Sequence, residues 1–306
     1  MIAILGGLGA AVAWAISTLC SSRSSRLIDP PSVVAWMMVV GLVITLPLVA
    51  LSGVPARLGP GSVAWLATSG IGNVGGLLLT YRALRVGQVA IVAPLVSTEG
   101  AVAALIAVIA GESVAPGVAV TLLAILAGVW LASVEEAPGP GEVPGPGDEL
   151  EPGGALRTVT ELDPSRAPNP YHAILSAIAA ALTFGVSLYA TGRAGTELPV
   201  SWVVLSARAI GTVALAIPLA ITGHLEITRR AAPLVITSGV CEVIGFYSYT
   251  TGARHGIAVA AVLSSQFGGL AALAAYFLFG ERLSRKRTLG VCTMLAGVAV
   301  LSALRA

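Results

Sequence analysis

Ten long apolar stretches follow one another along the chain, separated by short polar segments or by glycine and proline. A transmembrane helix needs about 20 mostly apolar residues to cross the hydrocarbon core, and the stretches are long enough for this. None shows the strict alternation of apolar and polar residues that a transmembrane β-strand requires. We therefore predict an all-α membrane protein with ten transmembrane helices. The predicted spans are residues 2–20, 33–52, 62–82, 88–110, 116–134, 172–192, 200–222, 232–253, 257–279 and 288–304.

The composition of the chain favours lipid as its solvent. Hydrophobic residues make up 56% of the chain and charged residues 10%, whereas a soluble domain carries about 25% charged residues. A net charge of +2 gives nucleic acid no attractive surface. Cys20, Cys241 and Cys292 lack the spacing of a disulfide framework or a zinc site. We expect a multi-pass protein of the cytoplasmic membrane, monomeric or homodimeric, without metal or cofactor.

Residues 135–170 interrupt the apolar pattern. They hold eight of the 18 prolines and eight of the 15 acidic residues of the chain. Such a segment cannot bury an apolar core, and we expect it to be disordered or extended. It connects a first unit of five spans, residues 1–134, to a second unit of five spans, residues 171–306.

The two units match each other when the chain is shifted by 169 residues, or by 170 in the first spans. Because each unit has an odd number of spans, the second copy would lie upside down in the membrane. Two inverted five-helix repeats of this kind are typical of secondary transporters. The matched pairs are Thr68-Ser69-Gly70 with Thr237-Ser238-Gly239, Val74 with Val243, Gly76 with Gly245, Arg85 with Arg254, Gly100 with Gly269, Gly111-Glu112 with Gly280-Glu281, Leu126-Ala127-Gly128-Val129 with Leu295-Ala296-Gly297-Val298, Trp14 with Phe184 and Ser17 with Ser187.

Several short motifs are similar to those of a known family. They are Gly111-Glu112, Gly280-Glu281-Arg282-Leu283, Leu126-Ala127-Gly128-Val129, Leu295-Ala296-Gly297-Val298, Tyr81-Arg82-Ala83-Leu84 and Ala93-Pro94-Leu95. Outside the connector, the chain resembles the EamA-type permeases of the drug/metabolite transporter superfamily. The resemblance implies a carrier whose central cavity is lined by spans 1, 3, 4, 6, 8 and 9. Many relatives carry an arginine in the second span of each repeat, and here Arg208 fills this place in span 7 whereas Met38 stands in span 2.

Three charged residues stand inside predicted spans, where a charge costs about 2.5–3.5 kcal/mol on insertion scales. Spans 7 and 8 are antiparallel neighbours, and Arg208 and Glu242 lie at similar depths in them. The two could form a structural ion pair, or Glu242 could bind a cationic substrate group or a proton, and both roles can coexist. Glu99 has no charged partner within its own repeat. It is a candidate for a neutral hydrogen-bonding acid or for a proton-coupling site.

Further polar and aromatic residues surround these charges in the predicted arrangement. Asn73 is the repeat counterpart of Glu242, and Tyr249 lies two turns from Glu242 on the same helix face. Gln266 belongs to a polar cluster at mid-depth of span 9, and two more candidates share one face of span 1. The predicted substrate site consists of Glu242, Asn73, Tyr249, Gln266, Glu99, Trp14, Ser17 and Arg208.

The predicted function is secondary transport of a small organic solute by alternating access. The solute would be a metabolite, an amino acid or a drug-like compound, and protons are the candidate coupling ion. The sequence contains no nucleotide-binding loop, so gradients would supply the energy. The alternative function is that of a polytopic membrane enzyme acting on lipid. The sequence lacks a His-Glu metal motif, a Gly-Ser protease motif and an Asp-rich pyrophosphate motif, which disfavours the alternative.

The distribution of basic residues predicts an orientation. Twelve Lys and Arg residues lie in the loops between spans 1–2, 3–4, 5–6, 7–8 and 9–10, and four lie in the other loops and the C-terminus. The positive-inside rule then places both termini outside the cytoplasm, whereas the family resemblance implies termini inside. We follow the charges and predict that residues 135–170 and Arg285-Lys286-Arg287 face the cytoplasm.

Overall fold

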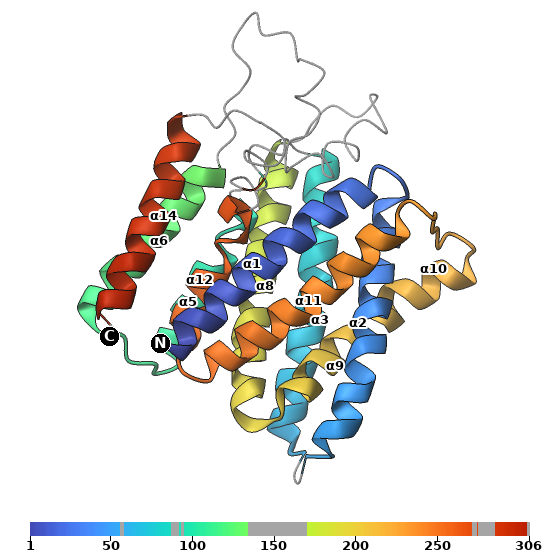
Figure 1. Ribbon diagram of the computed structural model, residues 1–306, viewed down its shortest axis with the longest axis horizontal. Helices are drawn as coiled ribbons and strands as arrows, with labels where there is room; N and C mark the ends of the chain where they lie inside the picture. Colours follow the sequence, from blue (N-terminus) through green and yellow to red (C-terminus); the bar gives the residue numbers. More distant parts are fainter. Residues whose placement is uncertain are drawn as a thin grey trace, which may run out of the picture.

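The computed structural model describes residues 1–55, 58–86, 92, 95–133, 170–270, 274 and 285–304. The described residues form helices joined by turns and loops, without a strand, so the all-α prediction is confirmed for this part of the chain (Figure 1). The helices are α1 (Ile2–Ser24), α2 (Pro30–Ser52), α3 (Pro60–Val86), α5 (Glu99–Ile109), α6 (Pro116–Ser133), α8 (Pro170–Glu197), α9 (Val200–Gly211), the π-helical turn η2 (Thr212–Ala216), α10 (Ile217–Ile221), α11 (Ala232–Ala253), α12 (Ile257–Ser264) and α14 (Arg285–Leu304).

Six helical stretches are long and apolar enough to cross a membrane: α1, α2, most of α3, α8, α9 through α10, and α11. Shorter apolar helices overlap the other four predicted spans, so the count of ten spans remains a prediction. Large apolar side chains cover much of the outside, and those of Leu51 and Ile221 are 85% and 80% exposed. Exposing an apolar surface of this kind to water would be unfavourable. The chain is therefore a multi-pass membrane protein.

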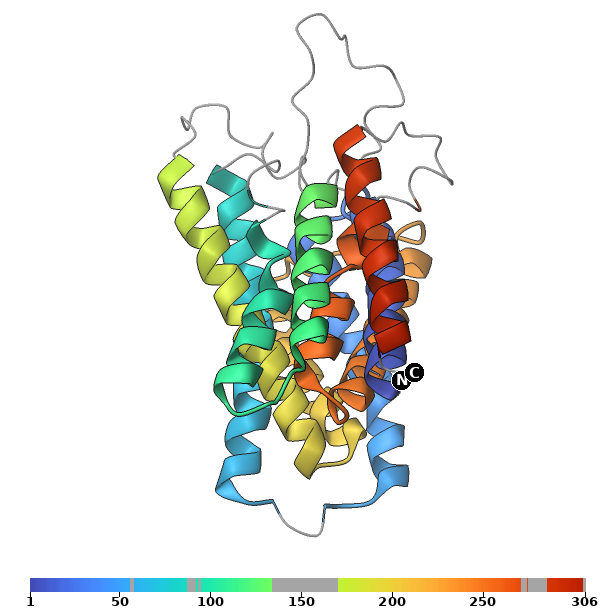
Figure 2. The same cartoon turned by 90° about the vertical axis from the view of Figure 1, so that its left-hand side faces the viewer.

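The helices form two bundles, and each bundle takes helices from both units. In the α1–α11 bundle, α1 packs against α11 and α12, and α2 packs against α11. In the α3–α8 bundle, α8 packs against α3 and α5, and α9 packs against α3. The bundles meet where α2 contacts α9 and where α12 contacts α5, while α6 and α14 pair at one side (Figures 1 and 2). Each of these contacts made by a helix of one unit has a matching contact made by its counterpart in the other: the α1–α11 contact matches α8–α3, and the α2–α11 contact matches α9–α3.

The helices in the predicted spans 88–110 and 257–279 are each interrupted by a turn. Helix α5 begins at Glu99 after a turn at residues 97–98, and α12 ends at Ser264 before a turn at residues 265–266. A hydroxyl group bonds to a backbone carbonyl at each break: Thr98 Oγ1 donates to the Leu95 carbonyl at 2.7 Å, and Ser265 Oγ donates to the Val262 carbonyl at 2.9 Å. Such side-chain bonds compete with the helical ladder. The two breaks fall within one residue of repeat-equivalent positions.

Helix α9 differs from its counterpart α2 directly after Arg208. The two prolines Pro47 and Pro218 are 171 residues apart, whereas Met38 and Arg208 are 170 apart, so the second unit has one extra residue in this interval. The π-helical turn η2 lies in the same interval. In a π turn the backbone hydrogen bonds join residues five apart, so the turn accommodates an extra residue within a helix. Such turns are frequent at functional sites.

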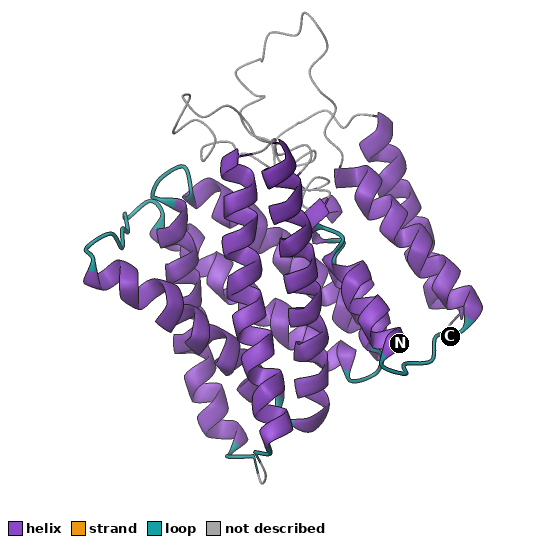
Figure 3. Ribbon diagram, turned by 180° about the vertical axis from the view of Figure 1, so that it is seen from behind, coloured by secondary structure: helices purple, strands orange, loops and turns teal. Residues whose placement is uncertain are grey.

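The start of α1 and the end of α14 lie close together at one end of the molecule in all three overall views (Figures 1, 2 and 3). The connections α5–α6, α8–α9 and α11–α12 lie at this end too, which we call the terminal end (Figure 1). An even number of crossings brings both termini to the same side of a membrane. The placement of the termini therefore agrees with an even number of spans.

Candidate functional site

The two bundles meet at a buried ion pair. Arg208 on α9 places its Nη2 atom 3.3 Å from Oε2 of Glu242 on α11. The Arg208 side chain is fully buried, and that of Glu242 is 20% exposed. The pair predicted from the depths of the two residues is thus present. It joins the α3–α8 bundle, which carries the arginine, to the α1–α11 bundle, which carries the carboxylate.

The remaining contacts of Arg208 are weak for a buried cation. Its Nη1 atom donates to the sulfur of Met38 at 3.3 Å, and its guanidinium carbon lies 4.5 Å from the centre of the Phe246 ring. The Nε atom has no hydrogen-bond partner among the described residues. A thioether and an aromatic face stabilise a cation less than a carboxylate does. Glu242 is therefore the principal counter-charge of this guanidinium in the described part of the chain.

One serine bonds to the second oxygen of the carboxylate, and another serine bonds to the first serine. Ser17 on α1 donates from Oγ to Oε1 of Glu242 at 3.2 Å. The hydroxyl of Ser238 lies 2.8 Å from the Ser17 hydroxyl and 3.0 Å from the Ser17 carbonyl oxygen. The sequence indicated Ser17 but missed Ser238 as a member of the site. The repeat match of Ser238 with Ser69 was the signal that could have indicated it.

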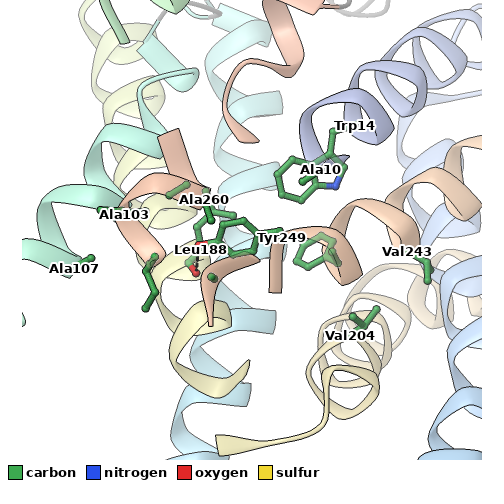
Figure 4. Packing of buried hydrophobic residues seen from close by; sticks show 14 residues of the cluster. Ala10, Trp14, Ala103, Ala107, Leu188, Val204, Val243, Tyr249 and Ala260 are labelled. Atoms are coloured by element: carbon green, nitrogen blue, oxygen red, sulfur yellow. Dashed lines mark hydrogen bonds between the residues drawn. The ribbon is translucent and has the colours of Figure 1, made fainter. Parts of the chain in front are cut away.

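An aromatic cluster fills the space beside the ion pair. The Trp14 ring lies 5.5 Å from the Phe246 ring, 6.2 Å from the Tyr249 ring and 6.4 Å from the Phe267 ring, measured between centroids. Tyr249 is fully buried, and its hydroxyl donates to the Leu188 carbonyl at 2.8 Å (Figure 4). Trp14 and Tyr249 therefore pack against one another within one buried apolar cluster.

Two more predicted residues lie at the interrupted helices. Glu99 is buried in the first turn of α5. Gln266 is 2% exposed, and its Nε2 atom has no partner among the described residues. The Nε1 atom of Trp14 also has no hydrogen-bond partner among the described residues. Because buried N–H groups are rarely unpaired, these donors mark positions where an acceptor could bind.

Asn73 occupies a different environment from its repeat counterpart. It lies half-buried on α3, which packs against α8 and α9, whereas Glu242 lies on α11, which packs mainly against α1 and α2. Among the described residues no hydrogen bond joins Asn73 to Glu242. The prediction that the two side chains reach one cavity stays a prediction. Pro94, which the sequence placed near Glu99, lies outside the described residues.

Where α2 crosses α9, equivalent residues of the two units contact each other. A Cβ atom on Gly41 would lie 2.7 Å from Cδ of Arg208, and a Cβ atom on Gly211 would lie 2.6 Å from Sδ of Met38. Gly41 and Gly211 are 170 residues apart, as are Met38 and Arg208. Each long side chain thus lies over the glycine of the opposite unit. The arginine and the methionine that replaces it in the first unit meet at this crossing.

The contact between α8 and α3 repeats the packing between α1 and α11. The same two serine positions meet in both bundles with donor and acceptor exchanged. The Ser187 hydroxyl donates to the Ser69 carbonyl at 2.6 Å, whereas the Ser238 hydroxyl donates to the Ser17 carbonyl at 3.0 Å. A Cβ atom on Gly76 would collide with the Phe184 ring, as one on Gly245 would with Trp14. The carboxylate is the feature without a counterpart, because Asn73 stands at that position.

The described residues offer no metal site. No group of three or more His, Cys, Asp or Glu side chains comes together among them. A hollow of about 590 Å³ lies away from the ion pair, at the terminal end. It is lined by Thr196, Glu197, Leu198, Pro199 and Arg254.

Comparison with known proteins places this arrangement in a family. The model of the EamA-like transporter family matches residues 1–134 and 172–303. The chain belongs to the EamA-like transporter family. This EamA-like protein also shares its fold with solved structures, of which 29 chains match. One of them, described as a crystal structure of a protein, has a TM-score of 0.74 and 20% identity over 99% of this chain and 96% of that chain.

No curated protein matches this EamA-like chain. Family membership makes it a multi-pass membrane protein of a family that transports small solutes. The identity of 20% to the solved structure supports the fold alone. The chemistry of the solute therefore has to be argued from the site.

Proposed function

We propose that this protein is a secondary transporter that moves a small organic solute across the cytoplasmic membrane by alternating access. The observation that carries the proposal is the Arg208–Glu242 pair, whose two partners belong to different bundles at their interface. A charge inside a membrane protein is costly and is usually retained for function. Rocking of two bundles about a central site is the usual mechanism of secondary transporters built from inverted repeats.

The proposed architecture has ten spans in two inverted repeats, residues 1–134 and residues 171–306, joined by the connector 135–170. The exchange of partners between the units supports it, because α1 packs against α11 as α8 packs against α3. The repeated serine contacts and the repeated aromatic-on-glycine contacts support it as well. Superposition of the two units in an experimental structure would test the inversion directly.

The proposed substrate site lies between the bundles and uses residues from both. Glu242, the more exposed partner of the ion pair, would bind a proton or a cationic group of the solute and release Arg208 when it does so. Glu99 and Asn73 would face the solute from the α3–α8 bundle. Trp14, Ser17, Tyr249 and Gln266 would face it from the α1–α11 bundle. The unpaired N–H groups of Trp14 and Gln266 suit a solute that carries acceptor oxygens.

Purified protein in vesicles tests the proposed function. We expect one or more members of a panel of amino acids, amines and drug-like compounds to raise its melting temperature and to exchange in counterflow. A carrier gives counterflow without added energy, whereas a lipid enzyme would give a chemically changed product. Solute flux through the vesicles that saturates with concentration supports the proposal. Absence of counterflow for every solute that stabilises the protein would contradict it.

The orientation follows from the basic loops. We propose that both termini face away from the cytoplasm, because Arg23, Arg26, Arg229 and Arg230 all lie at the end opposite the termini. Single cysteines placed at Ser25 and at Gly59, in a background without native cysteines, test this. A membrane-impermeant thiol reagent added to intact cells should label position 59 and spare position 25. The reverse pattern would overturn the orientation.

A further inference from the structure

The connection between α11 and α12 is held to the opposite bundle at two points. It leaves α11 at Arg254, passes Gly256 and enters α12 at Ile257. Glu112, which follows α5, accepts hydrogen bonds from the backbone N–H of Ile257 at 3.0 Å and of Ala258 at 3.2 Å. These bonds join the α3–α8 bundle, through α5, to the α1–α11 bundle, through α12.

The Glu112 contact replaces a local helix cap. The residue before α12 is Gly256, with φ +145°, and glycine has no side chain to cap the first N–H groups of a helix. A carboxylate from a distant loop takes that role, and it gains from its charge and from the helix dipole. Gly111, with φ +99°, forms the turn that presents Glu112. The repeated Gly-Glu motif thus has a defined contact in its first copy.

The second tie runs in the opposite direction. Arg254 donates from Nη2 to the carbonyl of Leu198 at 2.6 Å and from Nε to the carbonyl of Gly195, both at the C-terminal end of α8. Arg254 belongs to the α1–α11 bundle, and α8 belongs to the α3–α8 bundle. The 590 Å³ hollow at the terminal end is lined by Arg254 and Leu198, which also form this contact. Both ties therefore span the bundle interface at the end of the molecule where the termini lie.

We propose that Glu112 and Arg254 form a latch that keeps the transporter closed at its terminal end. The proposal rests on the proposed function, because a carrier that alternates must separate its bundles at this end during each cycle. Separation breaks both ties together, and neither tie is used elsewhere in the site. Beneath the latch, Ala10 and Ala260 are fully buried in the core. Opening of the latch would expose this core to water.

A cysteine reporter tests the latch without any solute. Ala10 lies eight residues beyond the start of α1, about 12 Å along the helix. In the full chain with Cys20→Ser, Cys241→Ala and Cys292→Ser, an Ala10→Cys reporter should react slowly with a membrane-impermeant thiol reagent. Glu112→Gln, which removes the charge, and Arg254→Gln should each raise its labelling rate at least tenfold.

Glu197→Gln is the matched control. Glu197 lies at the same end and accepts a hydrogen bond from Ser62 at 2.8 Å, but this contact stays within the α3–α8 bundle. Its labelling rate should remain within twofold of the parent. Glu112→Asp, which keeps the charge and shortens the reach, replaces Glu112→Gln if that variant does not fold.

The outcomes separate the latch from a structural cap and from the proposed function. Labelling rates within twofold of the parent in folded Glu112 and Arg254 variants would overturn the latch, even if their melting temperatures fall. A tenfold rise in labelling supports the latch. Because labelling needs no transport, a protein that shows the latch but gives no counterflow would lose the proposed function alone.

Discussion

The α1–α11 bundle and the α3–α8 bundle share their packing and differ in their charges. Both have a serine contact between their central helices, and both place an aromatic ring over a glycine. Four residues after Ser238, the first bundle has Glu242. Four residues after the matching Ser69, the second bundle has Asn73. The α3–α8 bundle supplies Arg208, whose counterpart is Met38. The comparison separates positions that serve packing, which are repeated, from the ion pair, which occurs once and to which we assign the function.

The largest expected effect comes from removing the carboxylate and leaving the arginine buried. Glu242→Met should lower the free energy of unfolding by about 3–5 kcal/mol, because an uncompensated buried charge remains. Arg208→Met should cost less, since the Glu242 side chain is 20% exposed and its charge can be solvated by water. Thermal unfolding of the purified variants measures both.

The double variant Arg208→Met with Glu242→Asn sharpens this comparison. It gives the second unit the residue pair of the first, Met38 and Asn73, and should recover most of the lost stability. Glu226→Gln, a change outside the helices, is the control and should leave the melting temperature unchanged. A double variant as unstable as Glu242→Met would show that charge neutralisation does not explain the stabilising effect of the pair.

Overpacking of the repeated aromatic contacts should have a smaller effect, equal in the two bundles. Gly245→Ala pushes against Trp14 and Gly76→Ala pushes against Phe184, and each should lower stability by about 1–3 kcal/mol. Gly59→Ala is the control, because nothing lies within 4 Å of an added Cβ atom there. Losses that differ by more than about 2 kcal/mol between the two variants would break the equivalence of the bundles.

The smallest effect is expected at the paired serines. Ser238→Ala and Ser69→Ala should each cost about 1 kcal/mol, the value of one hydrogen bond. Ser238 contacts Ser17, which donates to Glu242, whereas Ser69 has no carboxylate in its contact. Ser238→Ala alone should therefore change the pH dependence of solute uptake. An equal change of the pH profile in both variants would contradict the difference between the bundles.

The sequence predicted the helices and the Arg208–Glu242 pair because hydrophobicity and depth are both encoded locally. It did not predict the break at residues 265–266, since serine is ordinary inside apolar helices. The bond of Tyr249 to the Leu188 carbonyl was also missed, because it depends on how α8 packs beside α11. The repeat offset could have indicated Ser238, because its counterpart Ser69 has the same neighbours in sequence.

The most direct test of the account is gradient-driven uptake by Glu242→Gln in vesicles, with a solute identified by counterflow. Glutamine keeps the size of the side chain and can still accept a hydrogen bond from Arg208, so Glu242→Gln should lose less stability than Glu242→Met. If Glu242 exchanges a proton or a cationic group during transport, uptake driven by a proton gradient should fall at least tenfold below that of the parent. Parental uptake by a folded Glu242→Gln protein would remove Glu242 from the mechanism, and Glu99 would then be the remaining acidic candidate among the described residues within the spans.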